Sequence, residues 1–290
     1  MDVNIKSREG EYIDTGVSDN GALSFLYENI IGRLILKLLI RRFVSKLAGI
    51  YMNSRFSKRL IKSTVEEANI DLTEYESTEF DSYNAFFTRK IKSGKRPIAT
   101  GADSFISPCD AKVSAYKISD DSCFYIKNSV YTATDLLGGN EALANGYKGG
   151  YCLIFRLTVD DYHRYCYIDD GKKGDNTYIP GVLHTVKPIA LGGYNIYKRN
   201  CREYTILKTK NFGEIVQVEV GAMMVGRIKN LHGCHTFRRG QEKGMFEFGG
   251  STVVLLVKEN TIAVDSDILA NTSDNIETVV RLGERIGSKI

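Results

Sequence analysis

The sequence has no cysteine pair in a CxxC pattern, no secretory signal peptide and no apolar run long enough to span a membrane. Its six cysteines stand apart, several of them in apolar segments, and the first residues, MDVNIKSREGEY, are polar and of mixed charge. These absences argue against a disulfide scaffold, a secreted protein and a transmembrane helix. We therefore expect reduced thiols in a cytosolic environment.

Several nucleotide-binding and hydrolase signatures are also missing. The chain has no Walker loop, no GxSxG elbow and no Rossmann fingerprint, since the glycine pair at Gly192 is not followed by a helical pattern. It has no internal repeat and no low-complexity segment, and we expect no nucleic-acid partner. With 290 residues, 43% of them hydrophobic and 26% charged, the chain has enough apolar residues for a sizeable core.

Acidic residues are absent from one long segment. Between Asn29 and Val65 there are nine Lys or Arg residues and no acid, although the net charge of the whole chain is only +4. A helical pattern covers 23–69, with its apolar residues on one face and its cations at four-residue spacing on the other: Ile31, Leu34, Ile35, Leu38 and Leu39, opposite Arg33, Lys37 and Arg41. We predict a basic amphipathic helix on an anionic membrane surface; the alternative is a helix packed on the core with a solvated basic face.

The remaining chain has the texture of a β protein. From Phe105 onward, short runs rich in Val, Ile, Tyr and Thr alternate with turn signals: KVSAYKI, CLIFRLTV, EYTILKT, EIVQVEVGAMMVGRI, STVVLLV and TIAV. This pattern predicts an α+β fold, with N-terminal amphipathic helices followed by a mainly antiparallel β barrel or sandwich. We assign 1–80 to a loose N-terminal arm of about twenty residues and the helical region, and 81–290 to the β-rich domain. Pro97 is expected to end a helix over 86–91.

Four stretches contain candidate chemical groups, and each also has an ordinary structural explanation. His163 lies among acids at the end of an apolar run, but a lone histidine is more often packed or exposed than catalytic. Asp110 follows a Ser-Pro turn and could simply precede a strand. The segment Gly249–Thr252 could be a β-bulge or a place where a hydroxyl approaches the backbone closely. HGCH, from His232 to His235, lacks a second ligand cluster at zinc spacing, so we expect no metal site.

Together these stretches resemble the pyruvoyl-dependent phosphatidylserine decarboxylase family. Five motifs occur in the family's order: YNAFFTRKIKSGKRPI at 83–98, SPCDAK at 107–112, DYHRYC at 161–166, VGAMMVGRI at 220–228 and GST at 250–252. They span about two thirds of the chain, and although each is weak alone, five in order are specific. The resemblance implies a self-processing enzyme that converts phosphatidylserine to phosphatidylethanolamine.

The resemblance also implies the roles of individual residues. Ser251 would attack the carbonyl of Gly250, so that the chain is cut between them and Ser251 becomes a covalent pyruvoyl group. His163 would take the hydroxyl proton and Asp110 would orient the imidazole, which makes an Asp-His-Ser triad. The pyruvoyl ketone would condense with the amine of the lipid and withdraw electrons while carbon dioxide leaves, without a metal. A β chain of 1–250 and an α chain of 251–290 would remain associated; a homodimer stays open.

Two residues depart from the family pattern. Cys166 stands where a second histidine is usual, and Ala111 where a glycine is usual. We predict that Cys166 positions substrate or donates a proton; the alternative is a small apolar residue that fills space. Two other functions stay open, a pyruvoyl decarboxylase for another amino-acid-bearing phosphate ester and a non-enzymatic membrane-binding relative. For the decarboxylase, whose substrate would be phosphatidylserine, the expected location is the cytoplasmic face of the cell membrane, as a peripheral protein that binds the anionic membrane surface through Arg33, Lys37 and Arg41.

Overall fold

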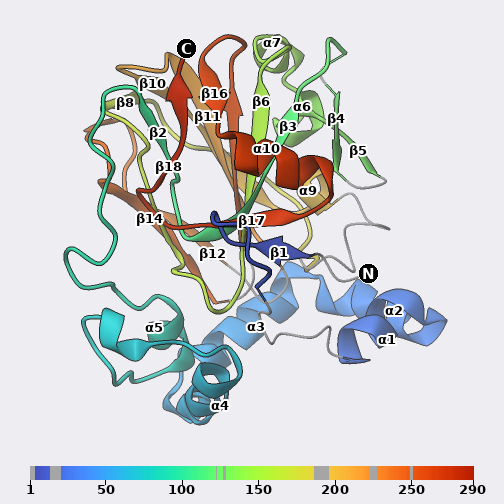
Figure 1. The fold of residues 1–290 in the computed structure, drawn as a ribbon. Coiled ribbons are helices and arrows are strands. Elements are labelled where there is room, and N and C mark those ends of the chain that lie inside the picture. Colours follow the sequence, from blue (N-terminus) through green and yellow to red (C-terminus); the bar gives the residue numbers. More distant parts are fainter. Residues whose placement is uncertain are drawn as a thin grey trace.

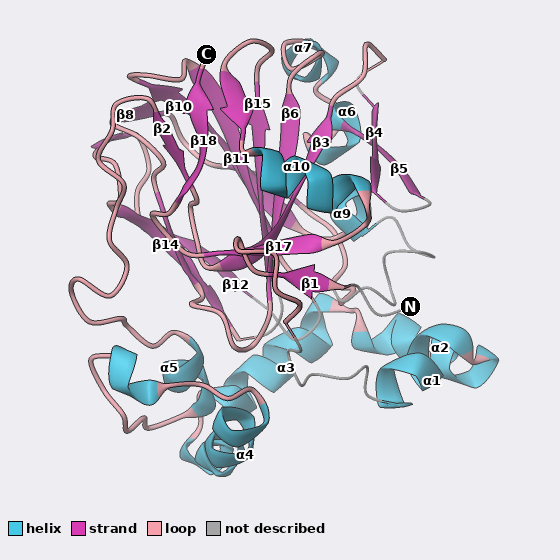
Figure 2. Ribbon diagram, viewed as in Figure 1, coloured by secondary structure: helices cyan, strands magenta, loops and turns pink. Residues whose placement is uncertain are grey.

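The computed structural model describes residues 4–13, 21–121, 123–126, 129–185, 196–222, 227–248 and 251–290. Gly192, the motif residues 223–226 and Gly250 lie outside the described residues. The described chain forms a broad β structure, with helices α1 to α5 gathered below the strands (Figures 1 and 2). Strands that are distant in sequence lie side by side in this structure.

The main sheet has ten strands in the order β1-β17-β3-β6-β15-β11-β10-β8-β13, with β9 paired to β10. All of its pairs are antiparallel except β1 with β17. The strands are β1 (Ile5–Lys6), β3 (Ala111–Lys117), β6 (Tyr151–Leu157), β8 (Gly171–Lys173), β9 (Thr177–Ile179), β10 (Arg202–Thr209), β11 (Glu214–Val220), β13 (His235–Phe237), β15 (Ser251–Val257) and β17 (Glu277–Val280).

Three smaller sheets complete the β structure. Their strands are β12 (Arg227–Asn230), β14 (Glu242–Glu247) and β7 (Arg164–Cys166) in one, β16 (Ile262–Val264), β18 (Arg285–Lys289) and β2 (Ser104–Ile106) in another, and β4 (Cys123–Ile126) with β5 (Ser129–Thr132). The predicted α+β class with mainly antiparallel sheets is confirmed. Since the described strands of the main sheet form an open order, the sandwich alternative holds and the barrel does not.

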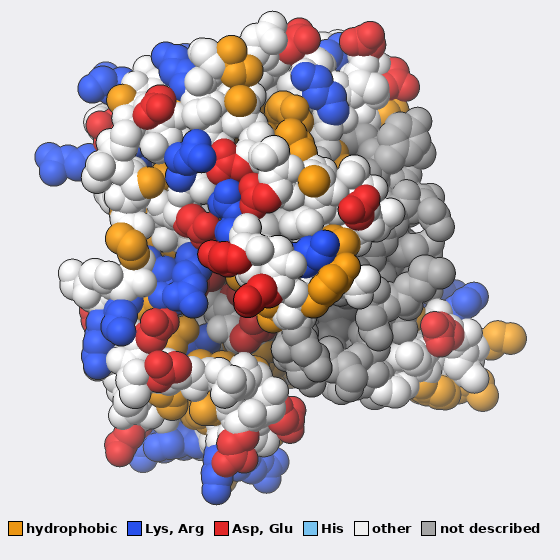
Figure 3. Space-filling view, in the orientation of Figure 1, with side chains coloured by type: hydrophobic (Ala, Val, Ile, Leu, Met, Phe, Trp, Pro, Cys, Tyr) orange, Lys and Arg blue, Asp and Glu red, His pale blue; other side chains and the backbone are white. Residues whose placement is uncertain are grey.

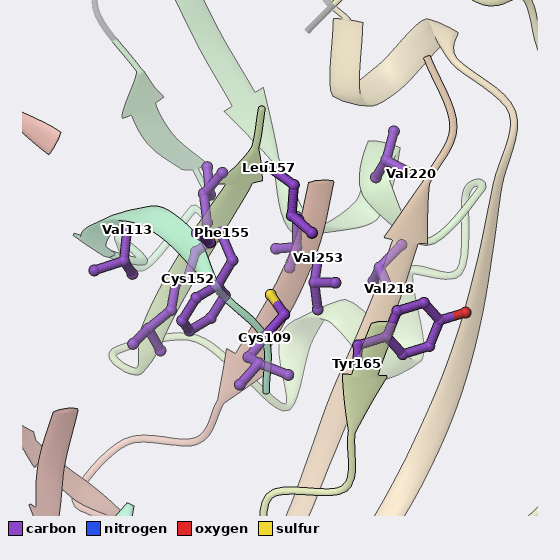
Figure 4. Close-up of a cluster of buried hydrophobic side chains, with 14 of the residues drawn as sticks. Cys109, Val113, Cys152, Phe155, Leu157, Tyr165, Val218, Val220 and Val253 are labelled. Carbon is purple, nitrogen blue, oxygen red and sulfur yellow. The ribbon is translucent and has the colours of Figure 1, made fainter. Parts of the chain in front are cut away.

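Strand β15 lies in the middle of the main sheet and has no exposed residue. Its Val and Leu residues favour a strand that is covered on both faces. On one side Ser251 pairs with Leu157 of β6, and on the other Thr252 pairs with Val220 of β11. Figure 4 shows part of the core that surrounds it, with Leu157 and Val253 among the packed side chains. The register therefore places Ser251 at the point where β6 ends.

Residues 4–13 do not form the loose arm that we predicted. Ile5 and Lys6 add a parallel strand beside β17, and Arg8 forms ion pairs with three acids near the C-terminus: Asp265, Asp267 and Glu284. Backbone pairing and a charge cluster with mutual hydrogen bonds fix this segment to the β structure. Because these contacts join residues far apart in sequence, a local reading of composition could not reveal them.

The helical segment 23–69 is confirmed, but it is broken into short helices. These are α1 (Gly21–Glu28), α2 (Ile30–Leu39), α3 (Arg42–Met52), the 3₁₀ helix η1 (Arg55–Lys58) and α4 (Arg59–Glu67). Asn29 caps α2, because its side-chain oxygen accepts from the N–H of Ile31 at 2.9 Å. No helix in the described part of the chain is both long and apolar enough to cross a bilayer.

The remaining helices are short. They are η2 (Leu72–Glu74), α5 (Tyr83–Phe87), α6 (Ala133–Leu136), α7 (Glu141–Asn145), α9 (Ile196–Arg199) and α10 (Ser266–Ser273). Our prediction that Pro97 ends a helix over 86–91 is wrong. Helix α5 begins at a cap in which the Ser82 hydroxyl accepts from the N–H of Ala85, and it ends at Phe87, well before Pro97. The cap fixes where this helix begins, and the proline does not set where it ends.

Candidate active site

Ser251 is the first residue of β15, and its side chain is completely buried. Its hydroxyl has no hydrogen-bond partner among the described residues. A buried hydroxyl without a partner costs about 1–3 kcal/mol, so such a group is rare unless it has a chemical role. Along the strand, Ser251 shares its face with Val253, because side chains alternate.

His163 immediately precedes β7, which belongs to the small sheet with β12 and β14. The N–H of Phe246 in β14 donates to its carbonyl at 2.9 Å. Its ring packs against Phe87 of α5, with 3.8 Å between the ring centroids. Phe87 in turn contacts Phe248, whose ring centroid lies 5.7 Å away. Since Phe248 precedes Ser251 by three residues, one aromatic chain of contacts connects the imidazole to the segment that carries the serine.

The tautomer of His163 follows from its neighbours. Nδ1 lies 3.0 Å from the backbone carbonyl of Asp161, and Nε2 is buried without a partner among the described residues. A carbonyl can only accept a hydrogen bond, so Nδ1 must carry the proton in the neutral ring. Nε2 then presents a free lone pair, which is the state a general base requires.

The protonation of His163 is set by its surroundings. Burial lowers the pKa of His163 to about 3, and the positive charge of Arg89 adds to the effect. The guanidinium of Arg89 donates to the carbonyls of Asp160 and Asp161 at 3.0 and 3.1 Å, which holds the same loop. The imidazole is therefore neutral at physiological pH.

The loop between β6 and His163 is braced by a buried lysine. The Lys112 ammonium donates to Asp160 at 2.6 Å and to both carboxylate oxygens of Asp161 at 2.9 Å. Asp161 also accepts from the N–H of Thr158 at 2.6 Å, and burial raises its pKa to about 6 against the opposing charge of Lys112. These contacts fix the turn that follows Leu157, so that the end of β6 beside Ser251 leads directly to His163.

Asp110 is not bonded to His163 in this structure. The Arg96 guanidinium donates hydrogen bonds to this carboxylate from Nε, at 2.9 and 3.0 Å, and from an NH₂ group, at 2.7 Å. The N–H of Leu282 also donates to the carboxylate, at 2.8 Å. The contact with Nδ1 of the imidazole is made by the Asp161 carbonyl and not by the Asp110 carboxylate. The physical reason is that the planar guanidinium satisfies both carboxylate oxygens. A catalytic role for Asp110 stays a prediction.

Cys166 ends β7 and is buried, with its N–H donating to the carbonyl of Pro108 at 2.8 Å. Burial raises the pKa of the Cys166 thiol to about 12. The thiol lines a cavity of about 230 Å³ together with Arg96, Tyr162 and Leu282. A neutral thiol with this pKa holds its proton tightly, which weakens its case as a proton donor. Its role stays a prediction.

The HGCH stretch forms a different kind of cluster. The rings of His232 and His235 stack with 4.0 Å between centroids, and their nitrogens contact Tyr167 and Gln241 at 3.1 Å. Cys234 in this stretch forms no disulfide, nor does any other cysteine in the described part of the chain.

Several residues of the site were missed from the sequence. Phe87, Arg89 and Lys112 all contact or support the loop that carries His163. Phe87 and Arg89 lie in the FFTR part of a motif that supported the family resemblance but gave no role to either residue. An arginine that closely follows two aromatic residues in a short helical pattern was the signal that could have identified Phe87 and Arg89. Lys112 gave none, because a lysine in a strand is ordinarily exposed.

A family model and several known proteins match most of this chain, and all of them carry the same family name. The family model described as phosphatidylserine decarboxylase matches residues 83–288. A phosphatidylserine decarboxylase proenzyme 2 from Clostridium acetobutylicum is 51% identical over 92% of each chain. Proteins named phosphatidylserine decarboxylase proenzyme from Clostridium botulinum and Fusobacterium nucleatum are 39% and 38% identical, over 97% and 98% of this chain and 97% of each relative.

Proposed function

Because the chain belongs to the phosphatidylserine decarboxylase family, we propose that it decarboxylates phosphatidylserine after its own backbone has been cut between Gly250 and Ser251. The product is phosphatidylethanolamine. The names of the relatives, which call them proenzymes, support both the reaction and the self-processing. We further propose that Ser251 and His163 carry out the cutting.

One observation carries this assignment of residues. The Ser251 hydroxyl and Nε2 of His163 are both buried and both lack a partner among the described residues. One is a proton donor and the other, by its tautomer, is a proton acceptor. Ser251 begins β15, and His163 immediately precedes β7. The register of β15 with β6 and the aromatic contacts through Phe87 and Phe248 bring these two strand ends into one region. A nucleophile and a base left unpaired in a dry core are the groups that serinolysis needs.

The cutting reaction then follows from the chemistry of these groups. His163 takes the hydroxyl proton through Nε2 while Ser251 Oγ bonds to the carbonyl carbon of Gly250. The C–N bond breaks, the nitrogen takes a proton, and an ester joins the two parts. Loss of the Cα proton expels the Gly250 carboxylate and leaves dehydroalanine, which water converts to the pyruvoyl group with release of ammonia. When present, the pyruvoyl group supplies the carbonyl that withdraws electrons as carbon dioxide leaves.

The imidazole of His163 supports this role through its position. The Asp161 carbonyl keeps Nδ1 protonated and so directs the lone pair of Nε2 outward from the loop. The same nitrogen, once protonated by the serine, can return a proton to the departing nitrogen. Phe87 covers one face of the ring and keeps water from it.

The two products of cutting stay together. The fragment 251–290 contributes β15 to the middle of the main sheet, β17 to its edge region, and β16 and β18 to a smaller sheet. β15 has neighbours on both sides, so its separation would break two complete ladders. We therefore propose that the mature protein is an associated pair of chains, 1–250 and 251–290.

A direct experiment tests the activity. Purified full-length protein, incubated with vesicles that contain phosphatidylserine, is expected to form phosphatidylethanolamine and carbon dioxide without added metal or cofactor. Reduction with cyanoborohydride in the presence of the lipid should stop turnover and add the lipid's mass to the 251–290 fragment. An intact single chain with full activity would overturn the pyruvoyl mechanism.

We also propose that the protein is peripheral at the cytoplasmic face of the cell membrane. Apolar side chains on α2 and α3 face outward instead of packing on the core: Ile30, Ile31, Leu34, Ile35, Leu38, Phe43, Leu47 and Ile50. Arg33, Lys37 and Arg41 are exposed beside them. Figure 3 shows hydrophobic and charged side chains at the end of the molecule formed by α1 and α2. Only a narrow stripe of α2, Gly32 and Leu36, is buried. This arrangement favours a membrane surface over the alternative of core packing.

The membrane proposal predicts a selective loss of binding. Leu34→Glu combined with Leu38→Glu should reduce binding to phosphatidylserine vesicles about a hundredfold or more, because each leucine contributes about 1.5–3 kcal/mol when buried in lipid. Co-sedimentation measures the effect, and cutting should be normal. The matched control adds the same charges to α7, at Ala142 and Asn145, far from α2 in Figure 1. Equal binding by both double variants would refute this surface.

A further inference from the structure

A cavity of about 690 Å³ lies between α3 and the end of β14. This volume falls in the range of small-molecule sites. Its polar lining residues are Ser45, Lys46, Asn53, Ser54, Asn84, Arg227 and Glu247. Its apolar lining residues are Phe43, Ile50, Met52, Leu183 and Phe248. A cavity with both kinds of wall suits an amphipathic ligand.

Ser45 is the unusual group in this wall. It is only 1% exposed, and its hydroxyl has no hydrogen-bond partner among the described residues. A helical serine commonly donates to a carbonyl one turn back. Ser63 and Thr64 of α4 do so, both to the carbonyl of Leu60, at 3.1 and 2.8 Å. Ser45 does not, so the cavity wall contains a buried hydroxyl donor that no described protein group uses.

The charges of the lining favour an anion. Lys46 is exposed and makes no ion pair within the described part of the chain. Arg227 is paired only loosely with Glu247, at 4.0 Å, and its side chain is 70% exposed. Two cations against one carboxylate leave one positive charge, which matches the single negative charge of a phosphodiester. Arginine and lysine are the side chains that most often bind phosphate.

The cavity reaches the aromatic contacts that lead to His163. Phe248 lines it, and its N–H donates to the side-chain oxygen of Asn84 at 3.0 Å. Asn84 in turn donates to Asn53 at 3.0 Å, so the wall is braced. Phe248 also contacts Phe87, which packs on His163. At the other side, Phe43 and Ile50 are 68% and 62% exposed and continue into the apolar surface of α2 and α3.

We propose that this cavity binds the phosphodiester of the lipid substrate, with the Ser45 hydroxyl and the Lys46 ammonium donating to its oxygens. The acyl chains then leave along Phe43 and Ile50, and the serine headgroup extends past Phe248 toward residue 251. This inference rests on the proposed function, because it concerns the substrate of that reaction. It adds two residues of α3 that recognise the part of the lipid between its chains and its headgroup.

The test uses the intact Ser251→Ala chain, so that neither cutting nor turnover affects the result. The probes are dihexanoyl phosphatidylserine and dihexanoylglycerol below their micelle concentrations, and binding is measured by calorimetry. Ser45→Ala and Lys46→Gln should each weaken binding of the phospholipid about tenfold or more, because each removes a hydrogen bond to a charged group. Binding of dihexanoylglycerol should not change. The matched control, Lys62→Gln, alters an exposed lysine of α4 outside the cavity and should leave both affinities unchanged.

A stability measurement separates recognition from folding. Because the Ser45 hydroxyl has no partner, Ser45→Ala should keep or raise the melting temperature while it lowers affinity. Equal affinity for the two probes, or unchanged phospholipid binding in both α3 variants, would overturn the phosphate site. Retained phosphate recognition in a protein whose wild type never decarboxylates phosphatidylserine would refute the proposed function alone.

Discussion

Ser251→Ala should yield a single uncut chain of 290 residues with no decarboxylase activity, whereas the wild type should give fragments of 1–250 and 251–290. Alanine cannot form the ester, so neither the break nor the pyruvoyl group can arise. The residual rate of decarboxylation is expected to be below detection, since no other residue can give rise to the pyruvoyl carbonyl at this position. Intact mass of the purified proteins measures the outcome directly.

The neighbouring threonine provides the matched control for this change. Thr252 is also buried, and its hydroxyl also lacks a partner among the described residues, but it points to the opposite face of β15. Thr252→Ala should therefore still be cut and active. If Thr252→Ala abolished cutting and Ser251→Ala did not, the nucleophile would be wrongly assigned. Loss of cutting in both would indicate that β15 itself had been disturbed.

The sequence predicted the parts of this protein that depend on local pattern. Five apolar residues in a row, from Val253 to Val257, identify β15, and alternation with turns identifies β3, β6, β10 and β11. The helical period identified the segment that became α2 and α3. Its exposed apolar face could not be read from periodicity, because the same pattern fits a helix packed on a core.

The hydrogen-bond partners of the site residues could not be predicted from local sequence pattern. Asp110 and His163 were joined by resemblance, yet Arg96 holds the carboxylate and the Asp161 carbonyl faces the imidazole. Arg96 lies in the RPI end of a motif, where charge alone does not identify a partner. β1 and β7 were also missed, since strands of two and three residues owe their existence to neighbours distant in sequence.

The second large effect concerns the base. His163→Ala should reduce the rate of cutting about a thousandfold or more, because an alcohol attacks an amide very slowly without a group to accept its proton. Pulse-chase in cell-free synthesis measures this rate. Cys166→Ala removes a buried side chain three residues away and should still be cut. Normal cutting in His163→Ala would show that another group takes the proton.

Asp110→Ala serves as a second comparison, because its effect has a different origin. It should also lose cutting if the triad is correct, but it leaves the buried Arg96 with Glu74 as its remaining acid. Breaking a buried pair costs about 3–5 kcal/mol, so its melting temperature should fall. His163→Ala leaves no charge unpaired, so any fall in its melting temperature should come from the cavity that the ring leaves beside Phe87. Cutting that returns when Asp110→Ala is stabilised by low temperature would make Asp110 a structural residue.

The pH dependence of cutting tests whether His163 acts as a buried, neutral base and does not only support the structure. An imidazole with the usual pKa of 6.5 would be roughly 97% protonated at pH 5, and cutting would slow about thirtyfold relative to pH 8. Since burial lowers the pKa of His163 to about 3, Nε2 keeps its lone pair throughout this range. Lowering the pH from 8 to 5 should therefore leave the rate nearly unchanged. Asp161, whose pKa is raised to about 6, gains a proton in this range, but its carbonyl and not its carboxylate contacts the ring. A thirtyfold fall with a midpoint near 6.5 would show that His163 works in an open, hydrated site.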